Sequence, residues 1–157
     1  MSTKQAKKLA KMRETLFEQG YVDKEQFEQL EECQDEADPN FVEEAVRSYY
    51  EKSSPQVLED ITEVLEENPL NFDKLKSLMT GFHGSSTSIG AKKVIKKCEE
   101  IDRHCQANNA ESFRRAFKQL KKEHTELKKK LDKYFQLANQ VRSETREDGS
   151  GPSSAAF

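Results

Sequence analysis

The feature that most constrains the fold is a long, uninterrupted heptad pattern near the C-terminal end of the chain. Apolar positions there alternate steps of four and three residues without a slip. They are Phe113, Phe117, Leu120, His124, Leu127, Leu131, Tyr134, Ala138 and Val141. Such a seam of about four heptads belongs to one helix, packed within an antiparallel bundle of its own chain or in a coiled-coil dimer. We interpret His124 as a core or boundary histidine of this seam.

Helix start and stop signals divide the rest of the chain into further amphipathic stretches. The signals are Gly20 as a stop, Asp23 as an N-cap, Asp38-Pro39 as an N-cap and first helical residue, Ser54-Pro55 as a restart or a kink, and Asn68-Pro69 as a stop. No stretch alternates with the period of a strand. We therefore predict an all-α, up-and-down four-helix bundle with additional short N-terminal helices, formed by residues 1–142. Residues 143–157 are polar and end in GSGPSSAAF, which predicts a disordered tail.

Charge is distributed unevenly along the 157 residues. Residues 21–70 hold 16 acidic and three basic side chains, whereas residues 74–133 hold 16 basic and seven acidic ones. The halves either attract one another as solvated helix faces or leave a basic surface for an acidic partner. Aromatic residues do not interleave with the basic ones, so we expect no nucleic-acid partner.

Cysteines, histidines and apolar runs argue against several classes of protein. Cys98 and Cys105 would lie about 10.5 Å apart along a helix, too far for a disulfide, so the cysteines are expected to be small buried hydrophobes. The three histidines lack metal-ligand spacing, so we expect neither a metal nor a cofactor. Apolar runs are too short to span a membrane, and the N-terminus lacks a signal peptide, which favours an intracellular protein.

The segment LMTGFHGSSTSIGA, residues 78–91, has loop composition between stretches of helical periodicity. It is not a phosphate-binding loop, because Gly84 and Gly90 lack the required spacing and no Lys-Ser or Lys-Thr pair follows. In a helix, Leu78, Phe82, Ser85 and Ile89 would face the core. Thr80, Gly84, Thr87 and Ala91 would form a small, flat outer face with His83 beside it. Beyond Gly90 the apolar stripe changes angle, which predicts that the helix bends or buries another face.

The small residues alone leave two interpretations open, tight packing between helices or close approach of another protein. The segment GSSTSIGAKKV, residues 84–94, resembles the signature HQxKGSSxSIGAxxV of the plant histidine-containing phosphotransfer proteins. LFEQGYVDKEQFEQLEECQDEADPNFVEEAV and QLKKEHTELKKKLDKYF also resemble helices of that family. The resemblance covers nearly all of residues 9–140. It implies a four-helix bundle, not an enzyme, that shuttles phosphoryl groups between receiver domains in cytokinin-type signalling, in cytosol and nucleus.

The sequence departs from this signature at the phosphate acceptor. Thr80 holds the position of the family's acceptor histidine, Gly81 that of its glutamine and His83 that of its lysine, while Gly84 is kept. Neutral imidazole is a good nucleophile near pH 7, whereas a threonine hydroxyl is weak without a base to activate it. Thr80 is therefore not expected to carry a phosphoryl group in a reversible relay.

Three hypotheses follow from this departure. The first is a pseudo-phosphotransfer protein that docks on the receivers of hybrid histidine kinases and response regulators and competes with active relatives. The second is a true carrier that uses His83, and the third is a helical interaction module outside any phosphorelay. For the first we predict a monomer, and a partner-binding surface made of Thr80, Gly81, His83, Gly84, Thr87, Lys92 and Lys93.

Overall fold

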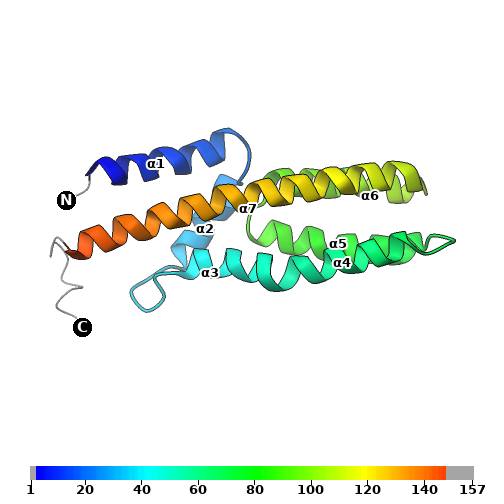
Figure 1. Cartoon of the computed structure of the whole chain (residues 1–157), viewed down its shortest axis with the longest axis horizontal. Coiled ribbons are helices and arrows are strands. Elements are labelled where there is room, and N and C mark those ends of the chain that lie inside the picture. The colour runs from blue at the N-terminus through cyan, green and yellow to red at the C-terminus, as the bar shows by residue number, and fades with distance from the viewer. Residues whose placement is uncertain (1–2, 148–157) are drawn as a thin grey trace.

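The computed structural model describes residues 3–147, with side chains from Lys4 to Glu144. Its elements are α1 (Thr3–Glu18), α2 (Lys24–Glu32), α3 (Phe41–Ser48), the π-helix η1 (Tyr49–Ser53), α4 (Ser54–Leu65), α5 (Phe72–Ser88), α6 (Lys92–Gln106) and α7 (Ala110–Glu147). No strand occurs within this part of the chain. The predicted all-α bundle is confirmed. The continuous column of α3, η1 and α4 forms one of its long elements, and α5, α6 and α7 form the others (Figure 1).

Helix α7, with 38 residues, is the longest helix of the described part and packs against both α6 and α1. Its heptad seam faces inward, with Phe113 and Leu120 fully buried and Leu127 and Leu131 nearly so. Helix α6 packs along its first half and α1 lies along its second half (Figure 1). One chain therefore covers its own seam. The helix also continues through residues 143–147, so the predicted start of a disordered tail at residue 143 is wrong, and residues 148–157 lie outside the described part.

The Ser54-Pro55 signal produces a local widening of the helix. Pro55 has no N–H to donate to the preceding turn and its ring crowds the carbonyl four residues earlier. The backbone responds with the π-helical segment Tyr49–Ser53, which runs directly into α4 without a loop. This turns the rings of Tyr49 and Tyr50 inward, where they contact each other edge to face at 4.9 Å.

Two of the predicted helix caps have different outcomes. Asp23 caps α2 as expected, because its carboxylate accepts a hydrogen bond of 3.0 Å from the Gln26 amide. The predicted start at Asp38-Pro39 is wrong, since α3 begins at Phe41. Asp38 instead donates its amide to the Asp35 carboxylate at 2.8 Å, which forms a local turn before the helix.

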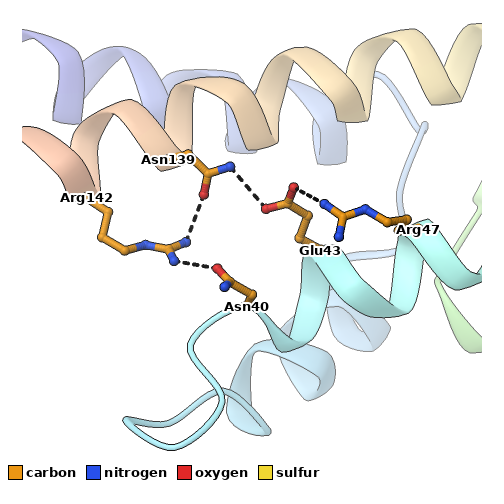
Figure 2. A network of polar contacts seen from close by, with 5 residues as sticks. All are labelled: Asn40, Glu43, Arg47, Asn139 and Arg142. Atoms are coloured by element: carbon orange, nitrogen blue, oxygen red, sulfur yellow. Dashed lines mark hydrogen bonds and ion pairs between the residues drawn. The ribbon is translucent and has the colours of Figure 1, made fainter.

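A polar network holds the start of α3 against the end of α7 (Figure 2). Glu43 accepts hydrogen bonds from Arg47 at 2.8 Å and from Asn139 at 3.2 Å. Arg142 donates to Asn139 and to Asn40 at the N-terminus of α3. These exposed contacts fix the orientation of two helices far apart in sequence rather than adding much stability.

The chain reverses at Gly90, so the prediction of one helix that bends or buries another face beyond Gly90 is wrong. Gly90 has a φ of 69°, α5 ends at Ser88, and α6 returns alongside α5. The turn pairs with the loop between α1 and α2. There the Asp23 amide donates to the Gly90 carbonyl at 2.8 Å, and the Lys92 amide donates to the Tyr21 carbonyl at 3.1 Å.

The cysteines and the helix lengths complete the description. Cys98 and Cys105 are buried in α6, whereas Cys33 is exposed, so the expectation of burial is wrong for Cys33. All three thiols are free. Burial raises the pKa of Cys98 to about 12 and that of Cys105 to about 11, so both stay protonated. No helix in residues 3–147 is long and apolar enough to cross a membrane.

Candidate functional site

Helix α5 carries most of the predicted site residues and begins with a well-formed cap. The side chain of Asn71 accepts a hydrogen bond of 3.1 Å from the Lys74 amide. The buried face of the helix is Leu75, Met79, Phe82 and Ser86. Ser85 and Leu78 are only half-buried, so the core face is rotated slightly from the predicted one.

The opposite face of α5 is exposed, and from Ser77 onward it consists of small residues. Its members are Ser77, Thr80, Gly81, Gly84, Thr87 and Ser88. The prediction that Thr80, Gly84 and Thr87 point outward is confirmed. Ala91, expected with them, is fully buried because it lies in the turn that pairs with the α1–α2 loop.

Gly81 and Gly84 decide between the two interpretations of the small residues. A Cβ atom built at either position would meet no heavy atom within 4 Å. Packing within the fold therefore does not require glycine at these two positions, although glycine lowers helix stability. The outer face of α5 is open to a partner rather than packed against another helix of the chain.

The hydroxyl groups on this face bond back to the helix itself. Thr80 donates to the Lys76 carbonyl at 2.9 Å, and Thr87 donates to the His83 carbonyl at 2.8 Å. A hydroxyl bound in this way has its proton directed at a carbonyl rather than at a base. No titratable side chain bonds the Thr80 hydroxyl within the described residues, so nothing there activates it as a nucleophile.

A groove of about 300 Å³ runs between α5 and α6 beside Thr80. Met79, Thr80 and His83 line it from α5, and Cys98, Glu99 and Asp102 line it from α6. His83 is half-buried, and its ring forms no hydrogen bond or ion pair with any residue in the described range. The groove thus brings Thr80 and His83 together, as predicted, and adds two carboxylates that the sequence interpretation missed.

Lys92 and Lys93 lie at the first turn of α6, away from Thr80. Because α6 runs antiparallel to α5, the residues that share the groove with Thr80 lie about two turns further along α6. The ammonium group of Lys93 lies 3.6 Å from the centre of the Tyr21 ring, a cation–π contact within the chain. Lys92 is half-buried at the base of the exposed face.

A buried cluster of aromatic and polar groups packs against the buried face of α5. Ser86 and the Tyr49 hydroxyl share a hydrogen bond of 2.7 Å, and the Tyr50 hydroxyl donates to the His124 carbonyl at 2.9 Å. The His124 ring bonds the Ser54 hydroxyl at 2.9 Å and lies 6.0 Å from the Phe82 ring. Burial lowers the pKa of His124 to about 4 and keeps its ring neutral, with a smaller contribution from Lys128. The interpretation of His124 as a core histidine is therefore confirmed.

No group of three or more histidine, cysteine or acidic side chains in residues 3–147 is arranged to hold a metal ion. The exposed face is a helix surface with the Thr80 hydroxyl at its centre and the imidazole of His83 beside it.

Comparison with known proteins places this geometry in a family. The Hpt domain family matches residues 45–130, which include α4, α5, α6 and the buried cluster. The chain belongs to the histidine-containing phosphotransfer family. The resemblance to that family in plants is thereby confirmed, and proteins of the family mediate phosphotransfer rather than act as classical enzymes.

Similar plant proteins include both histidine-containing phosphotransfer proteins and pseudo histidine-containing phosphotransfer proteins. Histidine-containing phosphotransfer protein 4 of Arabidopsis thaliana is 52% identical over 120 residues, 76% of this chain and 93% of the relative. Pseudo histidine-containing phosphotransfer protein 2 of Oryza sativa subsp. japonica is 44% identical over 130 residues, 83% of this chain and 85% of the relative. A solved histidine-containing phosphotransfer protein of Medicago truncatula superimposes with a TM-score of 0.84 at 31% identity, covering 91% of this chain and 96% of that one.

Proposed function

We propose that this Hpt protein is a pseudo-phosphotransfer protein, which docks on receiver domains through the outer face of α5 without carrying a phosphoryl group. The observation that carries the proposal is the environment of the Thr80 hydroxyl. Thr80 occupies the centre of an open helix face, but its hydroxyl donates to the Lys76 carbonyl, and no titratable side chain of the described residues forms a hydrogen bond with it. A phosphothreonine ester would also be a poor donor for onward transfer, unlike a phosphoramidate on imidazole.

The open face supports docking independently of the acceptor. Gly81 and Gly84 leave space beside Thr80 that no other part of the described chain fills. Short-lived signalling contacts need only a modest surface with complementary charges. By occupying receivers of hybrid histidine kinases and of response regulators, the protein would compete with relatives that do carry phosphate. We extend the proposal to a role in cytokinin-type signalling in cytosol and nucleus, as the family resemblance implies, and to a monomer, since the chain covers its own heptad seam.

A binding experiment tests the docking surface. We expect the native protein to bind receiver domains in titration calorimetry and Gly84→Gln to bind at least tenfold more weakly, because a long side chain would then stand one turn from Thr80. Thr125→Gln, at an exposed position of α7, is the matched control and should bind as the native protein does. If Gly84→Gln keeps its helix content and binds as the native protein does, the proposed docking surface is refuted.

A labelling experiment tests the absence of transfer. A receiver carrying labelled phosphate is mixed with the native protein, and acid-labile phosphate on the Hpt chain is measured over time. We expect no acid-labile phosphate on the native chain above background. The second candidate, a carrier that uses His83, is favoured by the free imidazole in the groove. Labelling of the native chain that is lost in His83→Ala would establish that alternative, and failure to bind any receiver would favour a helical module outside phosphorelays.

A further inference from the structure

The α6 wall of the groove beside Thr80 is acidic. Glu99 and Asp102 line the same groove as Thr80 and His83. Within residues 3–147, neither carboxylate forms an ion pair, and Asp102 accepts a single hydrogen bond of 3.3 Å, from the Gln106 amide. Each carboxylate therefore lies at the groove without a directly paired cation.

Two of the lysines of α6 are engaged away from these two carboxylates. Lys97 lies on the flank that faces α7, where it pairs with Glu100 at 3.1 Å and bonds Gln119 at 2.8 Å. Lys93 is held over the Tyr21 ring. The segment from residue 74 to residue 133 is basic overall, but the charged side chains that line the groove across from position 80 are two carboxylates.

We propose that Glu99 and Asp102 make the docking surface selective against a phosphoryl group, so that the protein prefers unphosphorylated receivers and disfavours phosphoryl transfer even with histidine at position 80. This inference rests on the proposed function, because it assumes that a receiver presents its phosphorylation site to position 80. A phosphoryl group carries a charge of about −1.5 to −2 at neutral pH. Two carboxylates without an ion-pair partner on the far wall of the groove repel that charge, whereas contacts made by the outer face of α5 do not depend on them.

Binding of one receiver in two states tests the selectivity. The receiver is used unmodified and with beryllofluoride, a stable analogue of its phosphoryl group, and each dissociation constant is measured for three Hpt chains. These are the native chain, Glu99→Gln with Asp102→Asn, and a matched control, Glu111→Gln with Asp132→Asn, which removes the same charges from exposed positions of α7. The quantity compared between the three Hpt chains is the ratio of the two dissociation constants. A conformational change of the receiver contributes to the ratio of every chain and therefore cancels in this comparison.

We expect the groove variant to shift this ratio by roughly tenfold toward the beryllofluoride form, since each screened charge pair contributes roughly threefold. The control should shift it less than twofold, and the difference should shrink as salt rises. If the native chain binds neither form, the proposed function fails. If it binds both but the groove variant and the control give the same ratio, the selectivity inference is overturned and the proposed function stands.

Transfer provides a second readout, in the background Thr80→His with His83→Lys. In that step the phosphorus–oxygen bond to the receiver's carboxyl group breaks and a phosphorus–nitrogen bond to imidazole forms. The carboxylate leaves with the electron pair, and the imidazole loses its proton. Adding Glu99→Gln and Asp102→Asn should raise the rate of acid-labile labelling roughly tenfold. An equal rate with and without the two groove substitutions, or no labelling of either chain, would contradict the role given to the two carboxylates.

Discussion

Replacing the exposed glycines of α5 with alanine should make the fold more stable. At Gly81 and Gly84 a Cβ atom would meet nothing within 4 Å, and both residues lie inside a regular helix. Alanine is better than glycine in a helix interior by about 1 kcal/mol, because it loses less backbone entropy on folding. Each substitution should therefore raise the free energy of unfolding by about 0.5–1 kcal/mol. For a chain of this size that corresponds to a Tm increase of roughly 1–4 °C.

Gly90→Ala is the matched control, because the third glycine of the segment has a structural role. Its φ of 69° costs a residue with a side chain about 1–2 kcal/mol, and its Cβ would lie 3.3 Å from that of Gln26. We expect Gly90→Ala to lower the free energy of unfolding by at least that amount. Urea unfolding followed by far-UV circular dichroism measures all three variants under the same conditions.

The result that would refute the reasoning is a loss of stability in Gly81→Ala or Gly84→Ala comparable to that in Gly90→Ala. The fold itself would then require those glycines, and their presence would say nothing about a partner. A gain in stability accompanied by weaker receiver binding would show instead that the chain retains glycine for contact at a cost in stability.

Three further predictions concern the core and the assembly. The pKa of His124 is about 4 in the folded protein and near 6.5 when unfolded, so the unfolded chain binds a proton that the folded one does not. The free energy of unfolding should fall by about 2–3 kcal/mol from pH 6.5 to pH 4, and His124→Gln should flatten that slope in urea titrations. Tyr49→Phe should cost about 1–3 kcal/mol by leaving Ser86 unsatisfied, and adding Ser86→Ala should recover part of this in a double-mutant cycle. Light scattering should give a monomer near 18.1 kDa, because the heptad seam is covered within one chain, and a concentration-independent dimer that Leu127→Glu dissociates into folded monomers would contradict this.

The helices were predictable because their signals are local. The seam of α7 and the cap at Asp23 each depend on residues within a few turns of one another. The start of α3 was not predicted correctly. Asp38-Pro39 satisfies the sequence rule for a helix start, but the Asp38 backbone amide donates to the Asp35 side chain in a turn. A short polar side chain can serve either structure, and local sequence does not distinguish them.

The reversal at Gly90 could not be read from local periodicity. What holds it is pairing with the loop after α1, through hydrogen bonds from Asp23 to Gly90 and from Lys92 to Tyr21. The sequence did carry a signal, the change of angle of the apolar stripe after Gly90, but a bend and a reversal both produce it. Once the chain is known to reverse there, antiparallel alignment places Glu99 and Asp102 across from Thr80. The acidic wall was missed for this reason alone.

The family signature in α5 combines two different roles, and the structure separates them residue by residue. Ser86 bonds Tyr49 in the core, Ile89 and Ala91 are buried, and Gly90 makes the turn that holds the N-terminal helices. These residues keep the bundle folded whether or not the protein carries phosphate.

Positions 80, 81, 83 and 84 are different, because they lie on the exposed face or at the groove and contribute little to the core. Three of these four depart from the family pattern, and only Gly84 is kept. Loss of phosphate transfer would remove the requirement for an imidazole at position 80 but not the requirement for a folded, approachable helix. A strong match to the signature therefore indicates the fold, and we propose that position 80 and the groove beside it determine whether the protein transfers phosphate.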